Sequence, residues 1–74
     1  MTLDLLSVNE TGIVTGYTSN TSTRKQLLSM GLTRNTEVTV VRVAPLGDPI
    51  EVKLRSFSLT LRKQDAAQIV IRKV

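Results

Sequence analysis

Apolar and polar residues alternate along most of this sequence. The alternation is clearest in residues 50–54, Ile-Glu-Val-Lys-Leu, and it returns in residues 57–62, where Phe57, Leu59 and Leu61 fall on the inward face. A period of two is typical of a strand with one face buried in a core. Further strands are therefore predicted over residues 12–18, 37–44 and 69–74.

The apolar run over residues 37–44 changes phase in its middle. Val38 and Val40 share one face, whereas Val41 and Val43 fall on the other. Such a shift predicts a β-bulge or a sharp coil, which lets a strand turn the corner of a small barrel. The two glycines of the first predicted strand likewise indicate a bend or a close approach of two backbones.

One segment follows a helical period instead. Thr23, with Gln26 three residues later, forms a capping-box pattern, and Gly31 suits the left-handed residue that ends a helix. The apolar stripe between them consists of Leu27, Leu28 and Met30. The pattern predicts a helix of about two turns, which is too short to be stable unless it packs against one mouth of a barrel.

The order of the elements predicts the fold class. A strand leads through a helix-bearing connection to three strands joined by short hairpins, and residues 62–68 supply a tight turn or single helical turn before the last strand. This order predicts an all-β fold, a small SH3-like five-stranded partly open barrel with one short α-helix in the first long connection. The 74 residues predict one domain over 1–74. The exposed strand edge of such a barrel could also support a weak homo-oligomer.

The amino-acid composition argues against most classes of enzyme. The chain has no histidine and no cysteine, so it lacks the usual general base and the nitrogen and thiolate ligands of tight metal sites. The single tyrosine, Tyr17, has no base to serve, and no phosphate-binding glycine loop occurs. The sequence therefore predicts neither an enzyme nor a bound cofactor. Without a basic leader or an apolar run of about 18 residues, it also predicts a cytoplasmic protein.

Charge leaves several partners open. The net charge is +4, and all ten lysines and arginines follow residue 23. This basic part of the chain could favour an acidic protein, a phosphate backbone or an anionic membrane as partner. Alternatively, the basic side chains are simply the solvated outward positions of the strands. The residues that could line phosphates are Lys53, Arg55, Arg62 and Lys63. Single-strand-binding barrels stack bases on aromatic side chains, and this chain has only Tyr17 and the inward Phe57. No nucleic-acid partner is therefore predicted.

Three stretches resemble a known family. They are APLGDPIEV at 44–52, LTLRKQDAAQI at 59–69 and, less specifically, LLSMGL at 27–32. In these stretches the chain is similar to the ferrous iron transport protein A (FeoA) family, from about Gly12 to Ile71. The resemblance implies an SH3-like accessory protein that binds and regulates the membrane ferrous iron transporter FeoB through its cytoplasmic region and meets the membrane only through that partner.

The same barrel type leaves two alternatives. The chain could be a general SH3-like module that binds protein or nucleic acid, or a domain akin to the C-terminal barrel of metal-dependent repressors.

Two positions depart from the FeoA pattern. Arg34-Asn35 replaces Pro-Gly, where asparagine still tolerates a positive φ, and Ser56 replaces a glycine, which predicts a hairpin of another geometry or one under strain.

The VAPLGDPIEV loop is the first candidate contact. Pro45 and Pro49 stiffen it and Gly47 permits an unusual φ, so Leu46 could be held outward as a preformed contact. Alternatively, Leu46 folds back over the end of the barrel. Asp48 and Glu51 could bind a hard cation weakly, but carboxylates alone do not favour tight Fe(II) capture, so no metal ligand is assigned.

The helix is the second candidate contact. Leu27 and Leu28 lie about 100° apart on a helix, so one of them is expected to be partly exposed, unless the whole stripe seals the barrel mouth. We expect Leu27→Gln or Leu46→Asp to weaken partner binding while the fold stays intact. The predicted contact residues are Leu27, Leu28, Met30, Pro45, Leu46, Asp48, Pro49 and Arg55.

Overall fold

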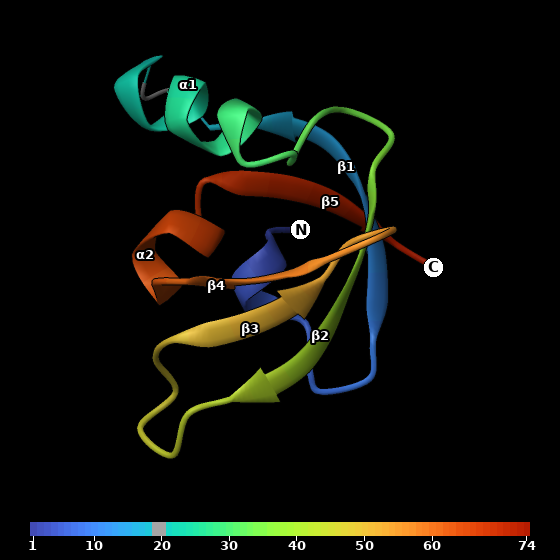
Figure 1. Cartoon of the computed structure of the whole chain (residues 1–74), viewed down its shortest axis with the longest axis vertical. Coiled ribbons are helices and arrows are strands. Elements are labelled where there is room, and N and C mark those ends of the chain that lie inside the picture. Colours follow the sequence, from blue (N-terminus) through green and yellow to red (C-terminus); the bar gives the residue numbers. More distant parts are fainter. Residues whose placement is uncertain (19–20) are drawn as a thin grey trace.

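Five strands form one antiparallel sheet in the order β4-β3-β2-β1-β5. The computed structural model describes residues 1–18 and 21–74. The strands are β1 (Thr11–Tyr17), β2 (Glu37–Val43), β3 (Ile50–Lys53), β4 (Ser58–Leu61) and β5 (Ile69–Lys73), and the helices are η1 (Leu3–Leu5), α1 (Thr21–Ser29) and α2 (Lys63–Ala66). The prediction of an all-β fold with one short helix in its first long connection is confirmed (Figure 1). The helical turn between the last two strands is also confirmed, as α2.

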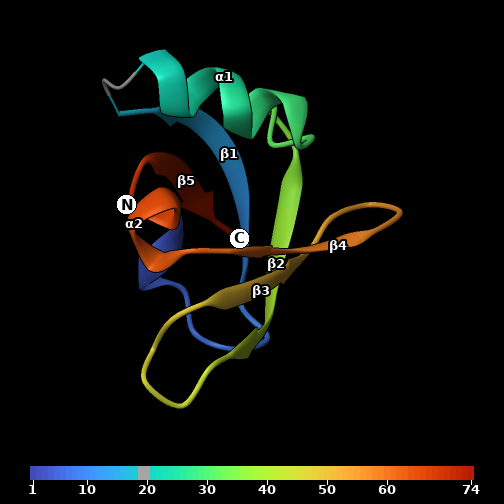
Figure 2. The same cartoon turned by 60° about the vertical axis from the view of Figure 1, so that its left-hand side comes forward.

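The predicted phase change in β2 is a real irregularity of the sheet. The pairing of β2 with β3 shifts register between Val40 and Arg42. Val38 and Val40 are completely buried before the shift, whereas Val41 and Val43 are only half-buried. The bulge therefore rotates the strand about its axis, and the sheet curls around the core (Figure 2).

Gly12 makes room for the side chain of Ile71, whereas the prediction named a bend or a close approach of two backbones. A Cβ atom on Gly12 would lie 2.5 Å from the Cδ1 atom and 3.2 Å from the Cβ atom of Ile71, on the neighbouring β5. Gly16 of the same strand differs, because an added Cβ would meet nothing within 4 Å. Gly16 instead follows a second register shift, between β1 and β5.

These two glycines make a matched pair of substitutions. We expect Gly12→Ala to lower the free energy of unfolding by about 1–2 kcal/mol, because the methyl group overpacks the core against Ile71. Gly16→Ala should change it by less than about 0.5 kcal/mol. Urea denaturation followed by circular dichroism measures both, and equal losses in the two variants would contradict the assignment of close contact to Gly12 alone.

The inward positions of the strands form the core, with one exception. Buried aliphatic side chains on β3, β4 and β5 occupy the predicted face, at Ile50, Val52, Leu61, Ile69 and Ile71. The prediction that Phe57 faces inward is wrong, since it is 47% exposed. It precedes the first residue of β4, so its ring extends past the sheet and lies over Gly31, where a Cβ would be 3.0 Å from the ring Cζ atom.

The N-terminal segment joins the core, although its sequence shows no periodic pattern that predicts this. Leu3 in η1 and Leu6 just after it are both buried. The Ile71 N–H donates to the Met1 carbonyl at 2.8 Å, and Thr2 forms a β-bridge with Val70. This segment therefore covers the outer edge of β5.

Helix α1 ends as predicted but begins earlier. The Leu32 N–H donates to the Leu27 carbonyl and the Gly31 N–H to the Leu28 carbonyl, both at 3.1 Å, and Gly31 has a φ of +98°. This is a Schellman motif with its left-handed glycine. The capping-box prediction is wrong, because the helix begins at Thr21 and Thr23 lies inside it.

Candidate docking surfaces

The β2–β3 loop holds Leu46 away from the core. Its side chain is 96% exposed, so the alternative that it folds back over the barrel end is wrong. The Gly47 N–H donates to the Ala44 carbonyl at 2.7 Å, and the Ala44 N–H donates to the Pro49 carbonyl at 3.1 Å. Two backbone hydrogen bonds and two prolines therefore hold an apolar side chain in water at the loop tip.

Asp48 ties this loop to α2. Its Oδ1 atom accepts a hydrogen bond from the Lys63 backbone N–H, the first residue of α2, at 2.8 Å. Glu51 belongs to a different contact, since its Oε1 atom lies 3.9 Å from Nε of Arg42. Within residues 1–18 and 21–74, no group of three or more aspartate, glutamate, histidine or cysteine side chains is placed to hold a metal ion.

The apolar stripe of α1 divides between core and surface. Leu28 is 39% exposed and Leu27 only 2% exposed, so the expectation that one of the two is partly exposed is confirmed. Met30 is half-buried and packs against the core. Leu27 itself is corrected as a contact residue, because the Schellman turn packs it inward beside Leu32 and leaves no surface for a partner.

The loop and the helix do not form one patch. In two views that share the vertical axis, α1 lies at the top of the molecule and the β2–β3 loop at the bottom (Figures 1 and 2). The molecule measures 29 Å along its longest axis. The predicted contacts therefore separate into a loop end, with Pro45, Leu46, Asp48 and Pro49, and a helix end, with Leu28 and Met30.

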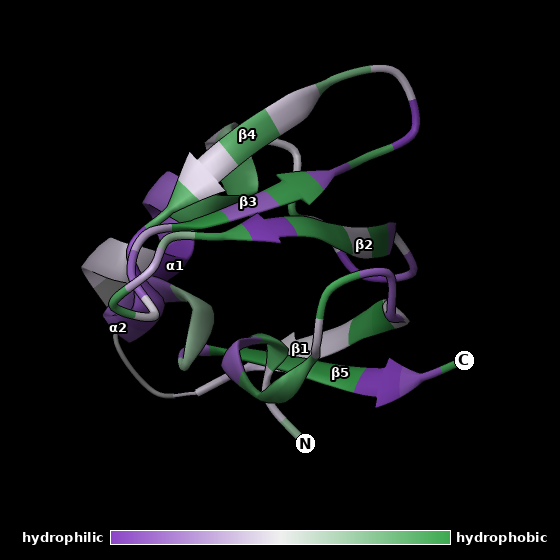
Figure 3. Cartoon of the chain, turned by 90° about the horizontal axis from the view of Figure 1, so that it is seen from below, coloured by the Kyte–Doolittle hydropathy of each residue, from purple (hydrophilic) through white to green (hydrophobic). Residues whose placement is uncertain are grey.

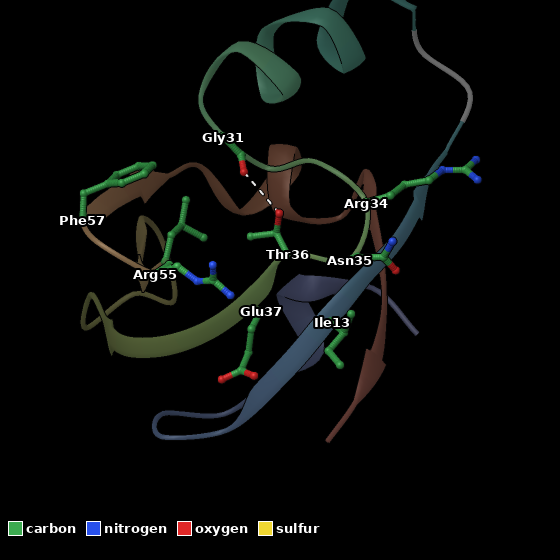
Figure 4. Close-up of a pocket in the computed structure, with 9 residues that line it drawn as sticks. Ile13, Gly31, Arg34, Asn35, Thr36, Glu37, Arg55 and Phe57 are labelled. Carbon is green, nitrogen blue, oxygen red and sulfur yellow. Dashed lines mark hydrogen bonds between the residues drawn. The ribbon is translucent and has the colours of Figure 1, made fainter.

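A pocket opens at the helix end. It lies between the α1–β2 connection and the β3–β4 turn, and it is lined by Ile13, Gly31, Arg34, Asn35, Thr36, Glu37, Leu54, Arg55 and Phe57 (Figure 4). The Arg55 guanidinium points into the space above Glu37, whereas the Arg34 guanidinium points away from it. Of these residues, Arg55 was among the predicted contacts, whereas Phe57 was not, because its strand-like phase indicated burial.

The chain still forms a turn at each of the two positions that depart from the FeoA pattern. Asn35 adopts a φ of +70°, as expected of asparagine at that position. In the β3–β4 turn the Leu54 N–H donates to the Phe57 carbonyl at 2.8 Å. Neither Arg55 nor Ser56 has a positive φ, so the hairpin uses another geometry than the primed turns, as predicted.

Tyr17 is engaged in structure. Its hydroxyl donates to the Leu32 carbonyl, which links β1 to the end of α1. Burial raises the pKa of the Tyr17 hydroxyl, so the group stays protonated near neutral pH.

No helix within the described part of the chain has the length and apolar character needed to cross a membrane.

Comparison with known proteins identifies the family of this chain. The FeoA domain model matches residues 1–73. A segment of 48 residues is 40% identical to the Fe(2+) transport protein A/Fe(2+) transporter FeoB fusion protein of Porphyromonas gingivalis, a match that covers 65% of this chain and 6% of that protein.

Solved structures agree with this family. A FeoA-like protein from Clostridium acetobutylicum superposes with a TM-score of 0.93 at 32% identity, over 100% of this chain and 86% of that one. The zinc complex of Stenotrophomonas maltophilia FeoA, described as an SH3 domain protein, has a TM-score of 0.82 at 25% identity, over 96% of this chain and 88% of that one. The SH3-like fold is thus confirmed, and the chain belongs to the FeoA domain family.

Proposed function

We propose that this protein is a non-catalytic accessory module of ferrous iron uptake that binds and regulates the cytoplasmic region of the transporter FeoB. One observation carries the proposal. A segment similar to this chain occurs in the FeoA/FeoB fusion protein of Porphyromonas gingivalis. Fusion holds two domains at high effective concentration, which is useful when the domains act on one another.

The chemistry of the chain supports contact as its mode of action. It has no histidine or cysteine, and the hydroxyl of its single tyrosine is bonded to the Leu32 carbonyl. What it presents to solvent instead is an apolar tip on a braced loop and a partly exposed leucine on a short helix. On this proposal the protein works in the cytoplasm and reaches the inner face of the membrane through its partner.

The loop end is the proposed primary contact. Leu46 is already held in place, so little conformational entropy remains to be lost when a partner covers it. Complete burial of one leucine contributes about 1.5–3 kcal/mol, equivalent to roughly 10- to 150-fold in affinity. The supporting contacts we propose are Pro45, Asp48 and Pro49 on the same loop, and Leu28, Met30 and Arg55 at the helix end.

The test compares two leucines exposed at different places. We expect Leu46→Asp to reduce capture of the purified FeoB cytoplasmic region at least about tenfold, because it replaces the buried apolar contact with a charge. Leu5→Asp is the matched control, since Leu5 is 63% exposed on η1, outside the proposed contact. Both variants should unfold within about 0.5 kcal/mol of the wild-type protein.

Two results would contradict the proposal at different levels. If Leu46→Asp and Leu5→Asp reduce capture equally, the loop is not the contact. If the wild-type protein binds no part of the FeoB cytoplasmic region by isothermal titration calorimetry, the assigned partner is wrong.

A further inference from the structure

The two outer strands of the sheet differ in whether their outer edges are covered. β5 lies at one margin and β4 at the other (Figure 3). The outer edge of β5 is covered by the N-terminal segment, through the Thr2–Val70 bridge and the hydrogen bond from Ile71 to Met1. Among the described residues, β4 pairs only with β3. One edge of the barrel is therefore closed and the other open.

The pairing of β3 with β4 shows which backbone groups the open edge presents. The Leu54 N–H bonds to the Phe57 carbonyl, so these two residues form a hydrogen-bonded pair. Antiparallel ladders alternate, so the next bonded pairs are Val52 with Leu59 and Ile50 with Leu61. The N–H and C=O groups of Ser58 and Thr60 consequently point away from β3, toward the empty side.

β4 is short, but its sequence carries none of the residues that commonly block an open edge. Its four residues, Ser-Leu-Thr-Leu, include no charge and no proline, and its register with β3 is continuous. Natural proteins commonly block open edges with lysine, proline or a bulge. Leu59 is half-buried and Phe57 is 47% exposed, so an added strand would find apolar surface beside the open backbone groups.

The charges around β4 select the kind of strand that fits. Lys53 lies opposite Ser58, and the residues that flank the strand are Arg55, Arg62 and Lys63. The nearby carboxylates are Glu37 below Arg55, Asp48, which accepts the Lys63 N–H, Glu51, 3.9 Å from Arg42, and Asp65 in α2. When Arg42 is counted, the basic side chains around the edge still outnumber these carboxylates, which favours an acidic segment.

The same charges argue against a second copy of the chain. An antiparallel copy paired through Ser58 and Thr60 would bring Arg55, in the β3–β4 turn of one molecule, toward Lys63, at the start of α2 of the other. Like charges brought together in this way weaken the association. An acidic extended segment meets no such repulsion.

We propose that the outer edge of β4 accepts an extended acidic segment of the partner protein as an additional strand. The inference deepens the proposed function and rests on it, because it names the chemistry of the partner segment. Backbone hydrogen bonds to Ser58 and Thr60 supply affinity, and the flanking basic residues select acidic sequence.

The main test separates the backbone of Thr60 from its side chain. Thr60→Pro removes an N–H that makes no bond to β3, so the fold should tolerate it, whereas Thr60→Ala keeps the N–H. Against the purified FeoB cytoplasmic region, we expect Thr60→Pro to bind at least about tenfold more weakly and Thr60→Ala within about twofold of wild type. If Thr60→Pro does not fold, Thr60→Glu replaces it and should weaken binding by repelling the acidic strand.

Two further measurements test the pairing and the charge. In the wild-type complex, amide hydrogen exchange at Ser58 and Thr60 should slow at least about tenfold. Arg62→Glu should weaken binding about three- to tenfold, whereas Arg72→Glu, on the covered edge at β5, should not.

Each contrary outcome has a distinct meaning. Equal binding by Thr60→Pro and Thr60→Ala, or unchanged exchange at Ser58 and Thr60 in the complex, overturns the strand-addition proposal and leaves the proposed function standing. Protection of these amides that rises with protein concentration in the absence of FeoB would show a second copy on the edge and also overturn it. If wild type binds no FeoB region at all, the proposed function fails first.

Discussion

Replacing Leu27 with glutamine is expected to lower the free energy of unfolding by about 3–5 kcal/mol, because the change combines a lost core side chain with a buried amide. Leu27 is 2% exposed, and its carbonyl accepts the Leu32 N–H that closes the end of α1. A domain of this size has a total stability of only about 5 kcal/mol, so much of the variant should be unfolded at 37 °C. Urea denaturation followed by circular dichroism measures the loss.

Leu28→Gln is the matched control for Leu27→Gln. Leu28 is the next residue and is 39% exposed, so the same substitution should cost less than about 1 kcal/mol. The initial expectation that Leu27→Gln leaves the fold intact is therefore corrected, and Leu28→Gln is the variant that can test the helix end as a docking surface. Equal stability of the two variants would show that Leu27 is not part of the core.

Gly31→Ala is expected to lower the free energy of unfolding by about 2–3 kcal/mol, from two separate causes. The residue has a φ of +98°, which an L-amino acid with a side chain adopts only under strain. In addition, the new Cβ would lie 3.0 Å from the Cζ atom of Phe57. Thermal and urea unfolding both report the change.

Two comparisons separate these causes. Gly47→Ala meets the same backbone strain, at a φ of +86°, with nothing within 4 Å of its Cβ, and should cost only about 1 kcal/mol. In a Phe57→Ala background, Gly31→Ala should likewise fall to about 1 kcal/mol, because the contact with the ring is gone. If the cost of Gly31→Ala is unchanged in that background, Phe57 does not restrict this position.

Local chemistry explains what could be predicted. The bulge in β2 could be predicted from the sequence because Val40 and Val41 are adjacent and both apolar. A regular strand points adjacent side chains to opposite faces, so it cannot bury both in one core. Gly31 was recognisable because a left-handed helix end strongly prefers glycine. The exposure of Leu46 was left open, since its position depends on how the loop is braced by contacts such as that between Asp48 and Lys63.

Contacts between distant segments explain what could not be predicted. Leu3 and Leu6 carry no strand period, and their burial depends on β5 and β2 accepting the N-terminal segment. Phe57 has the correct phase for an inward residue, but β4 starts only after it. That the helix and the loop lie at opposite ends of the barrel follows from the strand order, which no short motif encodes.

The strand order also changes how the proposed contacts are understood. A single small partner surface is not expected to cover the loop end and the helix end together, since they lie at opposite ends of a molecule 29 Å long. The open edge of β4 leads from the β3–β4 turn toward α2, whose first N–H is bonded to Asp48 of the loop.

On the proposed function, this protein acts by contact, through a loop already shaped for its partner. The loop contact can be tested by titrating the isotope-labelled protein with the FeoB cytoplasmic region and following backbone amide signals by NMR. We predict that the amide signals of Ala44, Leu46, Gly47 and Asp48 shift and saturate near one equivalent, while the buried core of the sheet keeps its spectrum. Unchanged signals of these four residues at saturating partner would contradict the proposed loop contact.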